Sequence, residues 1–279
     1  MSQQNNCEPE NVGGLERKTK LLHQSLTALG RVAIAYSGGT DSSLLLAVAR
    51  DTLGPGNVLA LHNQTELQKP GEAQEAIGRA IQKGFELERD LLVINSGPLT
   101  RPDIVRNDSL RCYYCKKSLY SEFSTLATHR DFPYLLDGTN TDDLLEPRPG
   151  KEAIAELGVC TPLADVGFNK RDVRVLSRKL GLVTWNRPSG SCLATRIPNG
   201  IALRREDLHR VATLEEMVER LGFSGCRVKP ESGNWKRVSV QIREEDFPSL
   251  LSIDKRKTLC HLLSIQGISE IFSNIRGRV

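Results

Sequence analysis

The sequence lacks several features that would define a protein class at once. No stretch approaches the ~20 consecutive apolar residues that a membrane-spanning helix needs, and the first residues, 1–6, are polar and contain no apolar signal core. Seven cysteines among 279 residues are too few for a disulfide scaffold of this length. Neither an internal repeat nor a low-complexity tract is present. We therefore expect a cytoplasmic globular protein with reduced thiols and no membrane partner.

Charge of one sign is also scarce. The formal net charge of +4 favours anionic ligands only weakly, and no RNA-binding module is recognisable, so a nucleic-acid partner is not expected. With 39% hydrophobic residues the chain can bury a substantial core, in one large domain or two modest ones. A small anionic molecule is the partner that this composition favours.

Apolar, β-prone stretches alternate with helical patterns over the first 180 residues. The expected strands are 32–36, 58–61, 91–94 and 134–137, and the expected helices are 14–29, 41–53, 71–84, 114–128, 151–157 and 170–180. This alternation predicts an α/β fold with a parallel sheet covered by helices on both faces. Ligands of such sheets bind beyond the carboxyl ends of the strands.

The pattern changes after residues 185–200, which are rich in Pro, Gly, Ser and Asn and predict a loop or linker. A small α+β unit is expected beyond it, with helices 204–221 and 254–263 and strands 226–229, 237–242 and 268–272. We therefore divide the chain into a disordered tail (1–13), a larger domain (14–190) and a small C-terminal domain (200–279).

The run Ser37–Ser42, S-G-G-T-D-S, lies between the first expected strand and a helix start. Glycines let backbone N–H groups approach an anion, which the positive end of the helix also attracts. Because the run contains no lysine, it is not the phosphate loop that serves γ-phosphate transfer. The turn Gly138–Asn140 follows the fourth strand, so both turns should face one site. The alternative is an ordinary turn in which Asp41 or Ser42 caps the helix.

This run resembles the PP-loop of enzymes that cleave ATP between the α and β phosphates, adenylate a substrate oxygen and release pyrophosphate. The resemblance implies that ATP contacts a set of residues in the two turns: Ser37, Gly38, Gly39, Thr40, Asp41, Ser42, Gly138 and Asn140. Asp41 is the best local oxygen ligand for the accompanying Mg²⁺, and helix capping is its alternative role.

Cys112 and Cys115 form a C-x-x-C pair in a loop or at a helix start, and Cys192 lies in the motif Ser191–Gly200. Nearby cations favour thiolate at both places. Three interpretations remain open on the residues alone. A zinc site would need four ligands, and no second pair is present. A redox pair at a helix start and an iron–sulfur cluster with one open iron are the others.

These features, together with Asp137–Asp143, Arg148–Gly150 and Ser191–Gly200, resemble the LarE family over residues 14–275. LarE proteins are ATP-dependent sulfur transferases that act on pyridinium-3,5-biscarboxylic acid mononucleotide and help to make the nickel-pincer nucleotide cofactor of lactate racemase. The resemblance implies adenylation of a carboxylate, followed by displacement of AMP by sulfur. Some members sacrifice a cysteine at the position of Cys192, whereas others bind a [4Fe–4S] cluster. Cys112, Cys115 and Cys192 imply the cluster type.

The same resemblance implies substrate-binding residues. Arg227 and Lys229 alternate along a strand and match basic positions that contact a substrate phosphate, although the family has arginine where Lys229 stands. A solvated edge face is the alternative. Glu215 matches an acidic position near the cysteine site, or lies on a solvated helix face. Arg196 and Arg148 would hold phosphate or order loops.

Two other functions are compatible with these motifs. A PP-loop tRNA thiolase would apply the same activation to a base carbonyl oxygen with a three-cysteine cluster. An ATP-binding redox or sulfur-sensing regulator would use Cys112 and Cys115 as a switch without transfer. In every case we expect the C-terminal domain to bind substrate or to join copies of the chain into a homo-oligomer.

Overall fold

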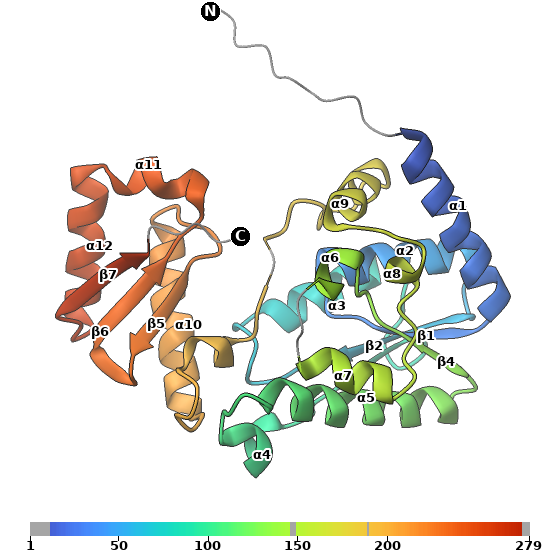
Figure 1. Ribbon diagram of the computed structural model, residues 1–279, viewed down its shortest axis with the longest axis horizontal. Helices are drawn as coiled ribbons and strands as arrows, with labels where there is room; N and C mark the ends of the chain where they lie inside the picture. The colour runs from blue at the N-terminus through green and yellow to red at the C-terminus, as the bar shows by residue number, and fades with distance from the viewer. Residues whose placement is uncertain (1–11, 146–148, 189, 275–279) are drawn as a thin grey trace, which may run out of the picture.

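The computed structural model describes residues 12–145, 149–188 and 190–274, which contain two separate sheets (Figure 1). The first is parallel, in the order β3-β2-β1-β4, and is made of β1 (Val32–Ala35), β2 (Val58–Asn63), β3 (Leu91–Ile94) and β4 (Tyr134–Leu136). The second has the order β5-β6-β7 and is made of β5 (Arg227–Glu231), β6 (Asn234–Gln241) and β7 (Glu270–Asn274). The expected α/β class is confirmed.

Helices cover both faces of the first sheet, as Figure 1 shows. The helices on one face are α1 (Val12–Leu29), α2 (Thr40–Leu53), α3 (Glu72–Gln82) and α9 (Lys170–Lys179), and those on the other are α5 (Arg111–His129) and α7 (Pro149–Glu156). Alternate residues of a strand point to opposite faces. Val32 and Ile34 accordingly join the apolar cluster of the first face, whereas Ala33 and Ala35 join the other.

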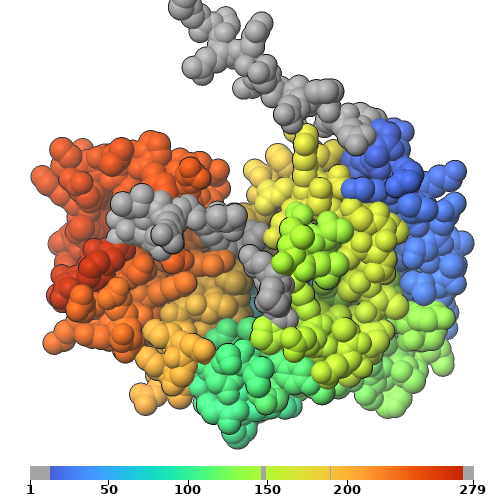
Figure 2. All heavy atoms as spheres, viewed as in Figure 1, coloured from blue at the N-terminus to red at the C-terminus, as the bar shows by residue number. Residues whose placement is uncertain are grey.

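The second sheet has its own apolar core under α10 (Arg205–Arg220) and α12 (Ile253–Ile265). Val228 of β5 and Val238 of β6 pack there against Val218 and Leu263 of the two helices. β5 and β6 are antiparallel, whereas β6 and β7 are parallel. In the space-filling view this unit, coloured orange to red, forms a lobe beside the larger one built on the first sheet (Figure 2).

The segment between the sheets is a loop, as expected, but it is packed rather than free. Leu193, Ala194 and Ile197 are buried in a cluster that includes Leu67 and Leu208. Backbone N–H groups of Leu193 and Leu203 donate to Leu67 O at 2.7 Å and Val105 O at 2.8 Å. The chain that precedes α10 is therefore fixed against the loops of the first sheet.

The other described elements are one-turn helices that the sequence pattern does not predict. They are η1 (Pro98–Thr100), α4 (Pro102–Val105), α6 (Thr141–Leu144), α8 (Pro162–Asp165), η2 (Leu193–Arg196), η3 (Glu244–Asp246) and α11 (Phe247–Leu250). Of the expected tail, residues 1–11 lie outside the described residues, and Val12 and Gly13 belong to α1. None of the helices described combines the length and apolar character needed to cross a membrane.

Candidate functional site

The turn Ser37–Ser42 joins the carboxyl end of β1 to α2 and leaves the start of this helix open. Gly38 has a φ of +74°, and a Cβ there would lie 2.4 Å from the Cβ of Ala76, so only glycine fits. Gly39 precedes the helix, and no side chain caps it. The alternative in which Asp41 or Ser42 caps α2 is therefore wrong. The uncapped N–H groups can bind an anion.

The turn after β4 contacts this cradle, as the sequence predicts. Asn140 Nδ2 donates to Asp41 Oδ1 at 2.8 Å, and Asn140 itself is fixed by a reciprocal capping box with Asp143 at the start of α6. A Cβ on Gly138 would lie 2.9 Å from the nitrogen of Ser42. Burial raises the pKa of Asp41, although the hydrogen bond from Asn140 opposes this. A carboxylate held beside an anion cradle suits a divalent cation.

A cavity of about 610 Å³ opens from the cradle. Ser37, Gly38, Gly39, Thr40 and Asp41 line it together with Cys192 and, from β5, Arg227. Three more cations, Lys170, Arg174 and Arg187, contribute to its wall. The anion cradle and the expected sulfur-handling cysteine therefore open into one space.

The three cysteines are neighbours. Cys112 and Cys115 lie in the first two turns of α5, and Cys192 immediately precedes η2. Burial, followed by the nearby Cys192 and Cys112, raises the pKa of Cys115 to about 11. Burial also raises the pKa of Cys192, against the opposing charge of Arg111. The expectation that nearby cations favour thiolate is wrong for Cys115 and Cys192, because burial outweighs the cations.

The three cysteines lie near one another, but their side chains are not arranged to coordinate one metal ion. Within the residues that the structure describes, no three His, Cys, Asp or Glu side chains are arranged to hold a metal ion. Cys112 is exposed, with Arg111 Nη2 at 3.5 Å from its sulfur, whereas Cys115 and Cys192 are half-buried against the apolar cluster of Leu193.

Glu215 is fully buried, with 0% of its surface exposed, so the solvated-face alternative is wrong. Arg196 donates to its two oxygens at 2.7 and 3.1 Å, and Lys69 Nζ lies at 2.9 Å. Burial alone would raise the pKa of Glu215, but Arg196 and Lys69 hold it below its ordinary value. Arg196 Nη1 also donates to the carbonyls of Ser191 at 2.8 Å and Cys192 at 3.2 Å. Arg196 thus orders the Cys192 loop, one of its two expected roles.

Arg227 and Lys229 lie on one face of β5 and are half-buried, but they line different cavities. Lys229 lines a cavity of about 440 Å³ together with Cys112 and Arg196. Burial lowers the pKa of Lys229, and the charges of Arg227 and Arg196 lower it further. A bound anion would reduce the electrostatic repulsion between these cations. Arg148, the other expected phosphate ligand, lies outside the described residues.

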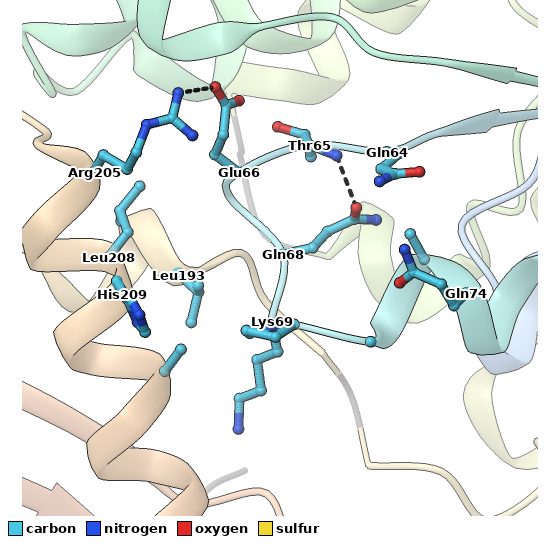
Figure 3. A pocket seen from close by; sticks show the side chains of 14 residues that line it. Gln64, Thr65, Glu66, Gln68, Lys69, Gln74, Leu193, Arg205, Leu208 and His209 are labelled. Atoms are coloured by element: carbon cyan, nitrogen blue, oxygen red, sulfur yellow. Dashed lines mark hydrogen bonds and ion pairs between the residues drawn. The ribbon is translucent and has the colours of Figure 1, made fainter.

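A further cavity, of about 480 Å³, lies between the β2–α3 loop and α10 (Figure 3). An ion pair of 2.8 Å between Arg205 and Glu66 closes one end, and Leu193 forms part of its wall. Gln68 lines both this cavity and the cradle cavity. Lys69 extends from the same loop toward Glu215. Sequence patterns missed Lys69 because no motif surrounds it.

Comparison with known proteins assigns the family. No protein-family model matches the chain. It is 37% identical over 226 residues to an uncharacterised protein of Synechocystis sp., covering 81% of this chain and 82% of that protein. It is 34% identical over 215 residues to the pyridinium-3,5-bisthiocarboxylic acid mononucleotide synthase of Lactiplantibacillus plantarum, a LarE protein, covering 77% of this chain and 76% of the relative. The chain belongs to the LarE family.

A more distant relative identifies the superfamily of this LarE protein. The chain is 29% identical over 232 residues to a glutamine-hydrolysing GMP synthase component of Thermoplasma acidophilum, covering 76% of this chain and 70% of the relative. GMP synthases are PP-loop proteins, which agrees with the strand–cradle–helix arrangement at Ser37–Ser42. The LarE and PP-loop resemblances of the sequence are both confirmed.

Proposed function

We propose that this LarE protein is an ATP-dependent sulfur transferase that adenylates a carboxylate of pyridinium-3,5-biscarboxylic acid mononucleotide and replaces oxygen with sulfur. The reaction would serve nickel-pincer nucleotide biosynthesis. The observation that carries the proposal is the single cavity lined by both the anion cradle and Cys192. The named activity of the Lactiplantibacillus relative favours this substrate over a tRNA base or a regulatory role.

Activation begins when a substrate carboxylate oxygen attacks the α-phosphorus of ATP. The bond to the β-phosphate oxygen breaks, and pyrophosphate leaves with its charge held by the N–H groups around Gly38 and Gly39. Lys170, Arg174 and Arg187 in the cavity wall would stabilise the same anion. Asp41 is the residue that would hold Mg²⁺, which when bound neutralises phosphate charge.

Sulfur transfer follows at the carbonyl carbon of the adenylate. A sulfide nucleophile adds there, the bond from carbon to the AMP oxygen breaks, and AMP leaves, so a thiocarboxylate remains. Arg196, anchored on buried Glu215, fixes the backbone of Ser191 and Cys192 beside this reaction. Adenylation thus lets AMP leave in place of oxide, which is a poor leaving group.

Cys112, Cys115 and Cys192 would hold a [4Fe–4S] cluster, which when bound supplies an iron with an open position for sulfide. The donor set suits this group because three neighbouring thiols on two segments match its soft-ligand chemistry. Among the described residues, the side chains do not converge on one metal position as they stand.

The phosphate of the mononucleotide would bind the cations of β5. Arg227 lines the cradle cavity, whereas Lys229 and Arg196 line the other cavity, and an anion bound in either one would relieve the repulsion among these cations. In this proposal residues 14–190 activate the carboxylate, and residues 200–279 recognise the nucleotide and join copies into a homo-oligomer.

Two measurements test the proposal. Pyrophosphate should be released only when ATP is supplied with the dicarboxylate mononucleotide, and release with a carboxamide analogue would contradict it. Protein isolated without oxygen should contain about four irons and acid-labile sulfides per chain, lost in Cys112→Ala. Absence of iron after reconstitution would overturn the cluster and leave Cys192 as a sacrificial sulfur donor.

A further inference from the structure

Two polar residues, one just before α5 and one at its start, connect the two cysteine-bearing segments. Asn107 lies just before α5, and Arg111 is the first residue of α5, next to Cys112. We propose that Asn107 and Arg111 are positioning residues that hold the Cys192 loop beside the cysteine pair of α5. The inference rests on the proposed function for the role of the cysteines, whereas the contacts stand on their own.

Asn107 binds the turn that follows η2. Its side chain is 0% exposed, and Nδ2 donates to the carbonyls of Pro198 at 3.0 Å and Ile201 at 2.9 Å. Its own carbonyl accepts a hydrogen bond of 2.9 Å from Gly200 N. The φ of Asn107 is +55°, a region that asparagine tolerates better than most residues. One buried side chain thus donates to two carbonyls of this turn, of which that of Pro198 also accepts from Ile201 N at 3.2 Å.

Arg111 extends this contact to the cysteines. Its Nη1 donates to Ala194 O at 2.9 Å, two residues after Cys192, and also hydrogen-bonds Asn107 Oδ1. Its Nη2 lies 3.5 Å from the sulfur of Cys112. A single guanidinium therefore contacts a cysteine of α5 and the backbone of the loop that carries Cys192, with Asn107 fixing its orientation.

Other hydrogen bonds also hold the loop that carries Cys192, so the effect of Asn107 and Arg111 is local. Hydrogen bonds from Leu193 N and Leu203 N fix the two ends of the segment to the first sheet's loops. Asn107 and Arg111 bind only the part between them. Cys192 lies just before this part and is also held by Arg196. Removing Asn107 or Arg111 should therefore shift Ala194 directly, and Cys192 relative to α5 only through Ala194, while the two apolar cores remain intact. Misplacement of a reacting group by about 1 Å can slow a reaction by two orders of magnitude.

The test measures cysteine proximity without ATP or substrate. Dibromobimane joins two thiols only when both are within reach, and peptide mapping identifies a product that bridges Cys115 and Cys192. Arg111→Met and Asn107→Asp, which removes the amide donor but keeps the size and φ tolerance, should lower the yield of this product several-fold. Arg106→Met is the matched control, because Arg106 is exposed and pairs with Asp108 on the same loop.

Half-reactions supply the second measurement. In both variants pyrophosphate release should stay near the wild-type rate, whereas thiocarboxylate formation should fall roughly tenfold or more. If Arg111→Met does not fold, Arg111→Lys, which keeps the charge but has a single donor nitrogen, takes its place and should give a bridging yield between that of the wild type and that of Asn107→Asp. Unchanged bridging in folded variants, or no bridged product in the wild type, would overturn the proposal. If the wild type gives the bridged product but forms no thiocarboxylate, the result counts against the proposed function and not against the positioning role.

Discussion

Gly138 lies against the backbone of Ser42 so closely that a Cβ on Gly138 would stand 2.9 Å from the Ser42 nitrogen. Backbone at the start of α2 cannot move aside as the end of a flexible side chain can. The end of β4 and the start of α2 therefore form a single cradle that accepts no side chain at this position.

Replacing Gly138 with alanine should displace the N–H groups of the cradle and lower the rate of pyrophosphate release by at least roughly tenfold. Gly78→Ala in α3 is the control, because a Cβ there would meet nothing within 4 Å. That change should leave activity intact and stabilise the helix by about 0.5–1 kcal/mol. Pyrophosphate assays and thermal unfolding check both. Full activity in Gly138→Ala would show that this turn is not part of the proposed ATP site.

Asp41→Asn should abolish pyrophosphate release and yet raise the melting temperature near neutral pH. Burial raises the pKa of Asp41 in the folded protein, so its stabilising contribution exists at low pH and is lost as the pH rises through that value. Asparagine removes the buried charge and can still accept the hydrogen bond from Asn140. The gain in stability should therefore appear at neutral pH and vanish in acid.

Iron content should not change in Asp41→Asn, because Asp41 is held by Asn140 in the cradle and is not one of the three proposed cluster ligands. Loss of iron together with pyrophosphate release would contradict the division of roles between the cradle and the cysteine site.

Glu215→Gln should destabilise the fold, because it leaves Arg196 and Lys69 without their buried anion; breaking such a pair costs about 3–5 kcal/mol. Burial favours the neutral acid, but the two cations hold the pKa of Glu215 below its ordinary value of 4.5. Its contribution is thus present above that value and is lost as the pH falls through the folded-state pKa. Urea unfolding as a function of pH measures it.

The matched control for this change is Glu216→Gln on the next position of α10. Glu216 is 61% exposed and pairs with Arg220 one turn away, so its replacement should change stability by less than about 1 kcal/mol. Equal losses of stability at the two positions would mean that the buried ion pairs of Glu215 contribute no more than an exposed pair.

Cys192→Ala should stop thiocarboxylate formation while pyrophosphate release continues. In the proposed mechanism the cradle and Asp41 activate the carboxylate without the thiol, and Cys192, which lines the same cavity, takes part only in sulfur transfer. Cys260→Ala, at an exposed position of α12, is the control and should change neither thiocarboxylate formation nor pyrophosphate release. Retained thiolation in Cys192→Ala would exclude this residue from the mechanism.

Arg227→Met should raise the KM for the mononucleotide with little change in kcat, because the proposed function has this charge bind the phosphate in both the ground state and the transition state. The same variant assayed with the dephosphorylated nucleoside should match the wild type. Lys236→Met, at an exposed position of β6, is the charge control. An equal loss with nucleoside and nucleotide would show that Arg227 does not recognise the phosphate.

The parts of the site that sequence analysis found are those with local signals. The apolar strand before Ser37, the glycines and the helix after them lie within about twenty residues, so pattern and turn chemistry suffice. Asn140 and Asp143 show the spacing of a capping box, which predicts the start of α6 and could have been used.

The rest depends on distant parts of the chain. Glu215 has the pattern of a charged helix face, and its burial arises from Arg196 and from Lys69, which lies in the β2–α3 loop. Burial also reversed the expectation for the thiols, because the apolar cluster around Cys115 and Cys192 includes residues from distant parts of the chain, from Leu67 to Trp235. Such environments form only when loops of the first sheet meet the chain before α10.

The hydrogen bond between Asn140 and Asp41 joins residues 99 positions apart. A chain made from its N-terminus presents Ser37–Ser42 long before β4, which pairs with β1 and carries the turn that completes the cradle. Long-range pairing of this kind is slow because a large loop must close first. The cradle can therefore assemble only after about half of the 279 residues have been synthesised, so an anion that binds there can stabilise the late stages of folding but not the early ones.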